Sequence, residues 1–168
     1  MKQKIIPDRY QVFPRTLCFI THGDDVLLLR GAPDKKTWPD QYNGIGGHVK
    51  PDEDVHTAAQ REIREETGLA VRDLRLHGVI NIPVEPEGTG ILLFVFTARA
   101  EGRDARPSKE GTPEWIPVEE VDRLDVVEDL PILLPRVLSM GPDEAPFFAL
   151  YTYDEDGELV VTYASPTA

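Results

Sequence analysis

GHVKPDEDVHTAAQREIREETGL, residues 47–69, has the start and stop signals of one helix. Asp52 is a residue type that caps helix N-termini, and Gly68 supplies the left-handed residue that commonly ends a helix. These signals predict a helix over about residues 53–67. Its last turns gather Glu62, Glu65 and Glu66, although the helix macrodipole favours cations at that end.

The glutamates of this helix do not all face solvent. At about 100 degrees per residue, Glu62 and Glu66 fall on the same side as the apolar positions, whereas Arg61 faces the other way. Carboxylates four positions apart repel unless they are protonated or bridged by a cation. Oxygen ligands without His or Cys indicate Mg²⁺ or Mn²⁺, ions that commonly share their coordination shell with substrate phosphates.

The segments around this helix have the pattern of strands. Short apolar runs at 16–21 and 26–29 flank the turn-like HGDD and predict a hairpin. A second hairpin is expected from 74–84 and 91–100, at the centre of a sheet. The residues between the first hairpin and the helix are rich in Gly, Pro, Asp and Asn, which indicates a long irregular loop.

The C-terminal third combines one more strand at 114–118 with helices and a last hairpin. Residues 118–138 predict a short helix, a break, and an apolar helix that begins at Pro131, with a kink or boundary at Pro135. Residues 147–153 and 158–163 predict the closing hairpin. The order of elements indicates an α/β fold, in which a mixed sheet is covered by helices.

Composition limits the function. The chain has 168 residues, 30 acidic and 18 basic side chains, and a formal net charge of -12, so we expect one domain over residues 1–168 and no nucleic-acid polymer as partner. A small phosphate ligand stays possible, because a bound cation reverses the local electrostatics. The single Cys18 and the lack of a long apolar run indicate a cytoplasmic protein that enters no membrane.

Residues 47–69 resemble the Nudix box at each defining position. The matching residues are Gly47, Glu53, Arg61, Glu62, Ile63, Glu65, Glu66, Gly68 and Leu69. The order of the flanking strands extends the resemblance to most of the chain. It implies a Nudix-like α/β/α sandwich, with a loop-helix-loop and a C-terminal helix and β-hairpin at about 128–163, that hydrolyses nucleoside diphosphate derivatives.

The resemblance also implies roles for individual residues. Glu62, Glu65 and Glu66 would hold Mg²⁺, for which Mn²⁺ can substitute, with help from the Gly46 carbonyl. One of these carboxylates would accept a proton from the attacking water. Glu53 would pair with Arg61 to fix the loop, or serve only as an acid in the first helical turn. Gly47 and Gly68 would have structural roles.

Residues outside the box extend the expected site. Glu110 resembles a loop glutamate that serves relatives as an extra metal ligand or as the base; the alternative is a solvated acid. Residues 38–49 and 126–135 look like the base-reading segments of the subgroup that hydrolyses oxidised purine nucleoside triphosphates such as 8-oxo-dGTP. Asn43, Glu128 and Asp129 would then bind the base, although both acids suit a helix cap equally well.

Further contacts are expected around the substrate. Gly46 and Gly47 would contact phosphate, as would Arg30 and Lys35, although exposed cations need no functional explanation. Trp38, Tyr42 and Phe94 would either stack on a base or belong to the core. The expected reaction is the Mg²⁺-dependent hydrolysis of a nucleoside triphosphate to the monophosphate and pyrophosphate. The alternatives are hydrolysis of ADP-ribose or dinucleoside polyphosphates, and a non-catalytic nucleotide sensor. The sequence leaves the oligomeric state open.

Overall fold

Eight strands form one mixed sheet in the computed structural model, which describes residue 6 and residues 8–164. The strand order is β3-β2-β1-β5-β4-β7-β8, and β6 pairs with β2. The strands are β1 (Gln11–His22), β2 (Asp25–Gly31), β3 (Tyr42–Asn43), β4 (Val71–Val84), β5 (Thr89–Ala100), β6 (Gly111–Pro117), β7 (Phe147–Tyr153) and β8 (Leu159–Tyr163). All three predicted hairpins are present, and the β4–β5 pair lies at the centre of the sheet as expected.

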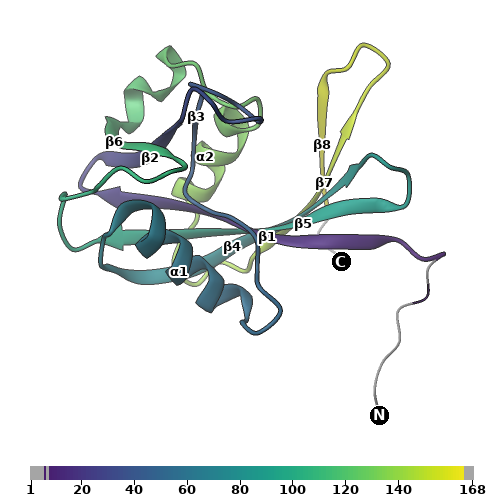
Figure 1. The fold of residues 1–168 in the computed structure, drawn as a ribbon, viewed down its shortest axis with the longest axis horizontal. Coiled ribbons are helices and arrows are strands. Elements are labelled where there is room, and N and C mark those ends of the chain that lie inside the picture. Colours follow the sequence, from purple (N-terminus) through teal and green to yellow (C-terminus); the bar gives the residue numbers. More distant parts are fainter. Residues whose placement is uncertain (1–5, 7, 165–168) are drawn as a thin grey trace.

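Parallel pairing between distant segments joins these hairpins. β1 runs parallel to β5 over eleven residue pairs from Gln11↔Thr89 to Thr21↔Arg99. β7 lies parallel to β4, and the β7–β8 hairpin projects from the body of the molecule (Figure 1). The sheet is therefore mixed, as the order of elements predicts.

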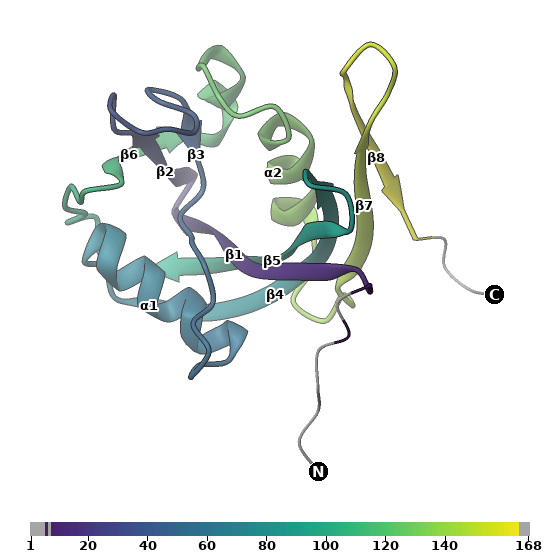
Figure 2. The same ribbon diagram turned by 45° about the vertical axis from the view of Figure 1, so that its right-hand side comes forward.

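Helices cover both faces of the sheet (Figures 1 and 2). Helix α1 (Val55–Thr67) packs on the face to which β1 presents Cys18 and Ile20, and helix α2 (Leu130–Ser139) packs on the face that receives Leu17 and Phe19. The alternation follows from the two-residue period of a strand. Cys18 is a free, buried thiol in this core.

Helix α1 begins later than the sequence predicts. The N-cap is Asp54, not Asp52, and its carboxylate accepts hydrogen bonds from the backbone N–H groups of His56 and Thr57, each at 2.9 Å. Glu53 is consequently outside the helix, so the alternative of a first-turn acid is wrong. The predicted end is confirmed, because Gly68 closes the helix with a φ of 71° and donates to the Arg64 carbonyl at 2.9 Å.

Two differences concern the segment before β7. The short helix is a 3₁₀ helix, Val118–Arg123, and α2 begins at Leu130, one residue before Pro131. Pro135 lies inside α2 and does not end it. The buried apolar stripe of Leu133, Leu134 and Val137 holds the helix on the sheet across the proline. No helix in the described part of the chain is both long and apolar enough to cross a membrane.

Candidate active site

The glycine loop, residues 44–47, lies against β1. Cys18 and Ile45 exchange two backbone hydrogen bonds, of 2.6 and 3.0 Å, and the Thr16 N–H donates to the Gly47 carbonyl at 2.9 Å. A Cβ on Gly46 would lie 2.0 Å from the Thr16 carbonyl oxygen. Only glycine allows the loop to come this close to the strand.

Glu66 is buried beneath this loop. Its side chain accepts a hydrogen bond from the Gly46 N–H, with 3.3 Å between N and Oε2, and the residue is 5% exposed. Burial, followed by repulsion from Glu62, raises the pKa of Glu66 to about 8, although the hydrogen bond from Gly46 acts to lower it. The site therefore contains a poorly solvated carboxyl group that forms no ion pair within the described residues, although the charge of Lys35 acts to lower its pKa.

Arg61 contacts three carboxylates at the same end of the molecule. Its Nη2 lies 2.6 Å from Glu53 Oε1, and its Nη1 lies 2.6 Å from Glu62 Oε1 and 3.1 Å from Glu65 Oε2. These bonds raise the pKa of Arg61. The expectation that Arg61 faces away from the glutamates is wrong for its guanidinium, because a long side chain can turn back along the helix from its Cα position.

The expected pairing of Glu53 with Arg61 is present. The hydrogen bonds from Arg61 and the backbone N–H of Lys50 lower the pKa of Glu53 to about 2. Arg61 also donates to the His48 carbonyl at 3.0 Å. Arg61 therefore joins the helix to the loop that precedes it.

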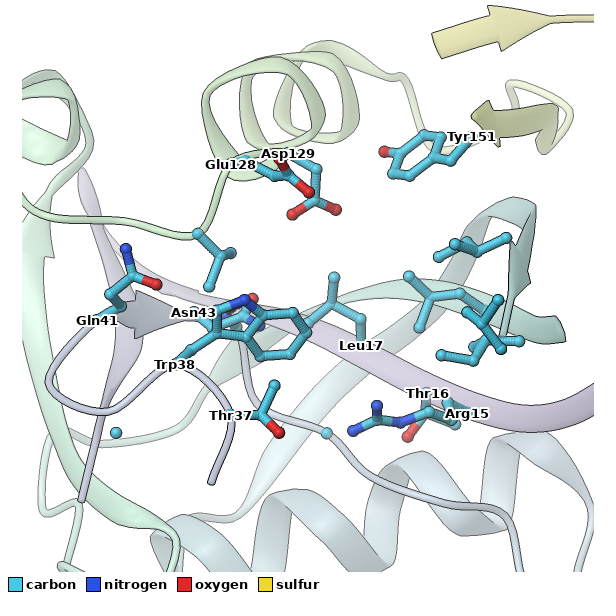
Figure 3. Close-up of a pocket in the computed structure, with 18 of the residues that line it drawn as sticks. Arg15, Thr16, Leu17, Thr37, Trp38, Gln41, Asn43, Glu128, Asp129 and Tyr151 are labelled. Atoms are coloured by element: carbon cyan, nitrogen blue, oxygen red, sulfur yellow. Dashed lines mark hydrogen bonds between the residues drawn. The ribbon is translucent and has the colours of Figure 1, made fainter. Parts of the chain in front are cut away.

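A cavity of about 390 Å³ extends from Glu66 to the start of α2. Its floor is apolar and comes from the central strands, with Leu17, Ile82, Ile91 and Leu93. Its rim is polar: Arg15, Thr37, Trp38, Asn43, Glu128 and Asp129 line it (Figure 3). An apolar cavity with a few converging polar groups is typical of a site for a small molecule.

Glu128 and Asp129 both line this cavity, and neither side chain makes a capping hydrogen bond to α2. Tyr153 donates its hydroxyl to Glu128 Oε1. Asp129 occupies the N-cap position, but its side chain makes no capping hydrogen bond, and burial raises the pKa of its carboxyl group. The capping alternative is therefore wrong, and both carboxyl groups are placed where a ligand can reach them.

The other expected substrate contacts divide into two groups. Asn43 and Trp38 line the cavity, and the Asn43 amide oxygen accepts the Gly44 N–H at 2.7 Å, which leaves the NH₂ end as a donor. Arg30, by contrast, is absent from the lining and pairs with Asp40 at 3.5 Å. Among the aromatics, Phe94 is partly buried and packs against the core on the α1 side.

Glu110 lies on a loop near this site and is half exposed. It pairs with Lys35 at 2.8 Å, and Lys35 itself lines the cavity. The negative charge of Glu110 also contributes to the raised pKa of Glu66. The structure therefore brings Glu110 into electrostatic range of the buried glutamate.

Comparison with known proteins identifies the family and the fold. The family model described as "NUDIX domain" matches residues 13–137. The chain belongs to the Nudix family. It is 33% identical over 132 residues to the oxidized purine nucleoside triphosphate hydrolase of Danio rerio, covering 75% of this chain and 82% of that one. The protein of the same name from Mus musculus is 31% identical over 127 residues, 72% of this chain and 79% of its own length.

A solved structure agrees. The MutT protein from Bacillus halodurans superimposes with a TM-score of 0.73 and 27% identity, over 91% of this chain and 97% of its own. This protein is a Nudix hydrolase, as the sequence predicts, and its glutamate-rich helix is the Nudix helix α1.

Nudix hydrolases generally use divalent metal cations. Within the described residues, no three His, Cys, Asp or Glu side chains lie close enough together to hold an ion, so the predicted cluster of three glutamates is not assembled here. The carboxylates of Glu62 and Glu65 pair with Arg61 instead. The oxygen ligands available here nevertheless fit a hard cation. Buried Glu66 lies beside Glu62 and Gly46, and a bound cation would relieve the repulsion between the two acids.

Several lining residues of this Nudix site were missed by sequence reasoning. Arg15 is on β1, and Tyr151 and Tyr153 are on β7. Arg15 is the one charged residue within an otherwise apolar strand pattern, a signal that could have been used. The tyrosines carry no such signal, because only the parallel pairing of β7 with β4 brings them to the cavity.

Proposed function

We propose that this Nudix hydrolase cleaves purine nucleoside triphosphates of the oxidised type, such as 8-oxo-dGTP, to the monophosphate and pyrophosphate, with Mg²⁺ as the metal ion and Mn²⁺ as a substitute. The observation that supports this most is the cavity, which links hydrogen-bonding groups at the start of α2 with buried Glu66 under the glycine loop. Two relatives that match most of this chain are named for hydrolysis of oxidised purine nucleoside triphosphates.

The end of the cavity near α2 suits a purine base. The apolar floor can cover its ring faces, and Trp38 lies at the rim. Asn43 offers amide N–H donors, whereas Asp129 can donate or accept according to its protonation. A pocket with such groups rejects bases that leave them unpaired. Binding of the purine base is therefore assigned to Asn43, Glu128 and Asp129.

The end near α1 suits the hydrolysis. Glu62, Glu65 and Glu66, with the Gly46 carbonyl, are the residues that would hold the cation. When bound, the ion would neutralise charge on the phosphoryl oxygens and lower the pKa of water. Glu110, Glu62 or Glu65 would accept the proton of the attacking water. Arg61 must then release Glu62 and Glu65, while its bonds to Glu53 hold the loop.

The decisive experiment is steady-state hydrolysis of a substrate panel in Mg²⁺, with identification of the products and EDTA as control. The panel contains 8-oxo-dGTP, dGTP, ADP-ribose and a dinucleoside polyphosphate. We expect the highest kcat/KM for the oxidised triphosphate and pyrophosphate as a product. Equal rates on ADP-ribose and 8-oxo-dGTP would reject the assignment and favour the wider class of nucleoside diphosphate derivatives.

Two variants test whether the purine base binds at Asp129. Asp129→Asn should raise KM for the oxidised purine triphosphate roughly tenfold or more, because a buried hydrogen-bonding group is changed. Asp122→Asn, an exposed acid in the 3₁₀ helix, should leave KM unchanged. If the two variants have equal KM values, the base does not bind at Asp129.

Other expectations stay predictions. They are the single domain over residues 1–168, the cytoplasmic location, and the absence of a nucleic-acid or membrane partner. Nucleotide binding without turnover of any substrate in the panel would instead favour the non-catalytic nucleotide sensor.

A further inference from the structure

The backbone of Arg15 is held beside residues 47–49. Its neighbours in β1 both bond to this segment: the Pro14 carbonyl accepts the Val49 N–H at 3.0 Å, and the Thr16 N–H donates to the Gly47 carbonyl at 2.9 Å. On the other edge, Arg15 is in register with Leu93 of β5. The backbone position of Arg15 is therefore fixed relative to the glycine loop.

The side chain of Arg15 points into the cavity. Figure 3 shows its guanidinium on the α1 side, whereas Glu128 and Asp129 lie on the α2 side. The electrostatic field at Arg15 comes mainly from Glu62, Glu66 and Glu110, the acids at the metal end. Arg15 therefore lies on the α1 side of the cavity, beside the acids of the metal end.

Arg15 has no partner for its charge. Within the described residues, no carboxylate forms an ion pair with it and its guanidinium makes no side-chain hydrogen bond. Other cations near the site are paired: Lys35 with Glu110 and Arg61 with Glu53. Burial lowers the pKa of Arg15 despite the acids around it. A partly buried, unpaired guanidinium is unfavourable unless a ligand supplies the counter-charge.

We propose that Arg15 binds a phosphoryl oxygen of the substrate's polyphosphate chain, which rests on the proposed function. A guanidinium has only donors, and its planar fork matches two oxygens of a phosphate. With the purine on the α2 side, where acceptors and an amide are present, the phosphates extend toward the α1 side, where Arg15 lies. The phosphate also supplies the counter-charge that the protein does not.

The test is equilibrium binding of two ligands that differ only in the phosphates. Isothermal titration calorimetry in Mg²⁺ compares the α,β-methylene analogue of the preferred triphosphate with the corresponding nucleoside. Arg15→Gln should weaken binding of the analogue at least roughly tenfold and leave nucleoside binding within about twofold. Arg15→Lys should restore part of the affinity, because it retains the charge without the fork.

Controls separate this role from folding and from metal binding. Arg123→Gln removes an exposed arginine of the 3₁₀ helix and should change neither affinity. The Mg²⁺ concentration that gives half-maximal activity should not rise in Arg15→Gln, since losing a cation cannot weaken a site for another cation through charge. Equal weakening of analogue and nucleoside, or no weakening of either, would overturn the proposal.

The test of Arg15 can fail independently of the test of the proposed function. If the wild-type enzyme prefers ADP-ribose, the substrate assignment fails, and the same comparison with the α,β-methylene analogue of ADP-ribose and adenosine tests Arg15. If the enzyme prefers 8-oxo-dGTP and Arg15→Gln binds the analogue as tightly as the wild type, the function stands and the role of Arg15 is rejected.

Discussion

Arg61 and Glu53 form a bidentate ion pair across the turn that precedes α1. Arg61 Nη2 lies 2.6 Å from Glu53 Oε1, and Arg61 Nε lies 2.9 Å from Glu53 Oε2. Their side chains are only 18% and 9% exposed. Glu53 also accepts the Lys50 N–H at 2.9 Å, so one carboxylate ties the helix to the turn. A pair with this geometry fixes position as well as charge.

Replacement of Glu53 should reduce activity without unfolding the protein. In Glu53→Gln an amide cannot accept both guanidinium bonds, so the guanidinium of Arg61 would turn further toward Glu62 and Glu65. We expect kcat to fall by about 10- to 100-fold, the usual range when a residue that positions a metal ligand is lost. Initial rates at saturating Mg²⁺ measure this; the exposed neighbour variant Asp52→Asn should retain wild-type rates.

The same variant should change the acid stability of the protein. Glu53 has a pKa of about 2 in the folded protein against an ordinary 4.5, so its stabilisation is complete above pH 4.5 and is lost as the pH falls toward 2. Urea denaturation between pH 2.5 and 7 should show a shallower loss of stability on acidification in Glu53→Gln. Parallel curves for variant and wild type would contradict the ion pair.

Asp54, rather than Asp52, should contribute to helix stability. Asp54→Ala removes the acceptor of two backbone N–H groups and of the Thr57 hydroxyl, and we expect the melting temperature to fall by roughly 2–4 °C. Asp52→Ala should shift it by much less. Differential scanning calorimetry of both variants distinguishes the structural cap from the one that the sequence indicates.

The fold could be predicted wherever the signal is local. The alternation of Leu17 and Phe19 with Cys18 and Ile20 gives a strand with two buried faces, and Gly68 ends the helix as expected. The pairing of β1 with β5 joins residues about 80 positions apart, and no local pattern specifies it. The cap was misplaced because Asp52 and Asp54 are chemically identical, and only backbone geometry selects between them.

The site was predictable to the same extent. The glutamates of α1 are recognisable in the sequence because their spacing places carboxylates on the apolar side of a helix. They also match the Nudix box. Arg61 was misjudged because Cα positions do not fix where a long side chain ends. Tyr151 reaches the cavity only through the packing of β7 on β4, so its part in the lining depends on tertiary structure.

Glu66 should lower stability at neutral pH in the absence of metal. Its folded pKa of about 8 exceeds the ordinary 4.5, so its contribution is most favourable below pH 4.5 and is lost as the pH rises through 8. With EDTA at pH 8.5, Glu66→Gln should be more stable than the wild type by about 1–3 kcal/mol, although inactive. At pH 4 the two should converge.

Glu65→Gln is the matched control for this prediction. Glu65 is 54% exposed and pairs with Arg61 and Lys50, so its removal should change stability by less than about 1 kcal/mol at either pH. Urea denaturation in EDTA measures both variants. A Glu66→Gln protein that is less stable than the wild type at pH 8.5 would mean that the carboxylate has a favourable partner in the folded state.

Gly46 and Gly47 should respond differently to the same substitution. A Cβ on Gly47 would lie 2.6 Å from the Glu62 carboxylate, the far end of a flexible side chain, whereas a Cβ on Gly46 would lie 2.0 Å from the Thr16 backbone oxygen. Gly47→Ala should therefore keep its fold and displace Glu62, with a loss of activity of about 100-fold or more. Gly46→Ala must move β1, so it should lose both thermal stability and activity.

Gly102 provides the reference for this pair, since a Cβ there meets nothing within 4 Å, and Gly102→Ala should match the wild type in both measurements. The contrast depends on what each glycine faces: a side chain can rotate to a new position, but a strand paired on both edges cannot shift without breaking its hydrogen bonds. If Gly47→Ala unfolds while Gly46→Ala keeps its melting temperature, the loop does not lie against β1 as described.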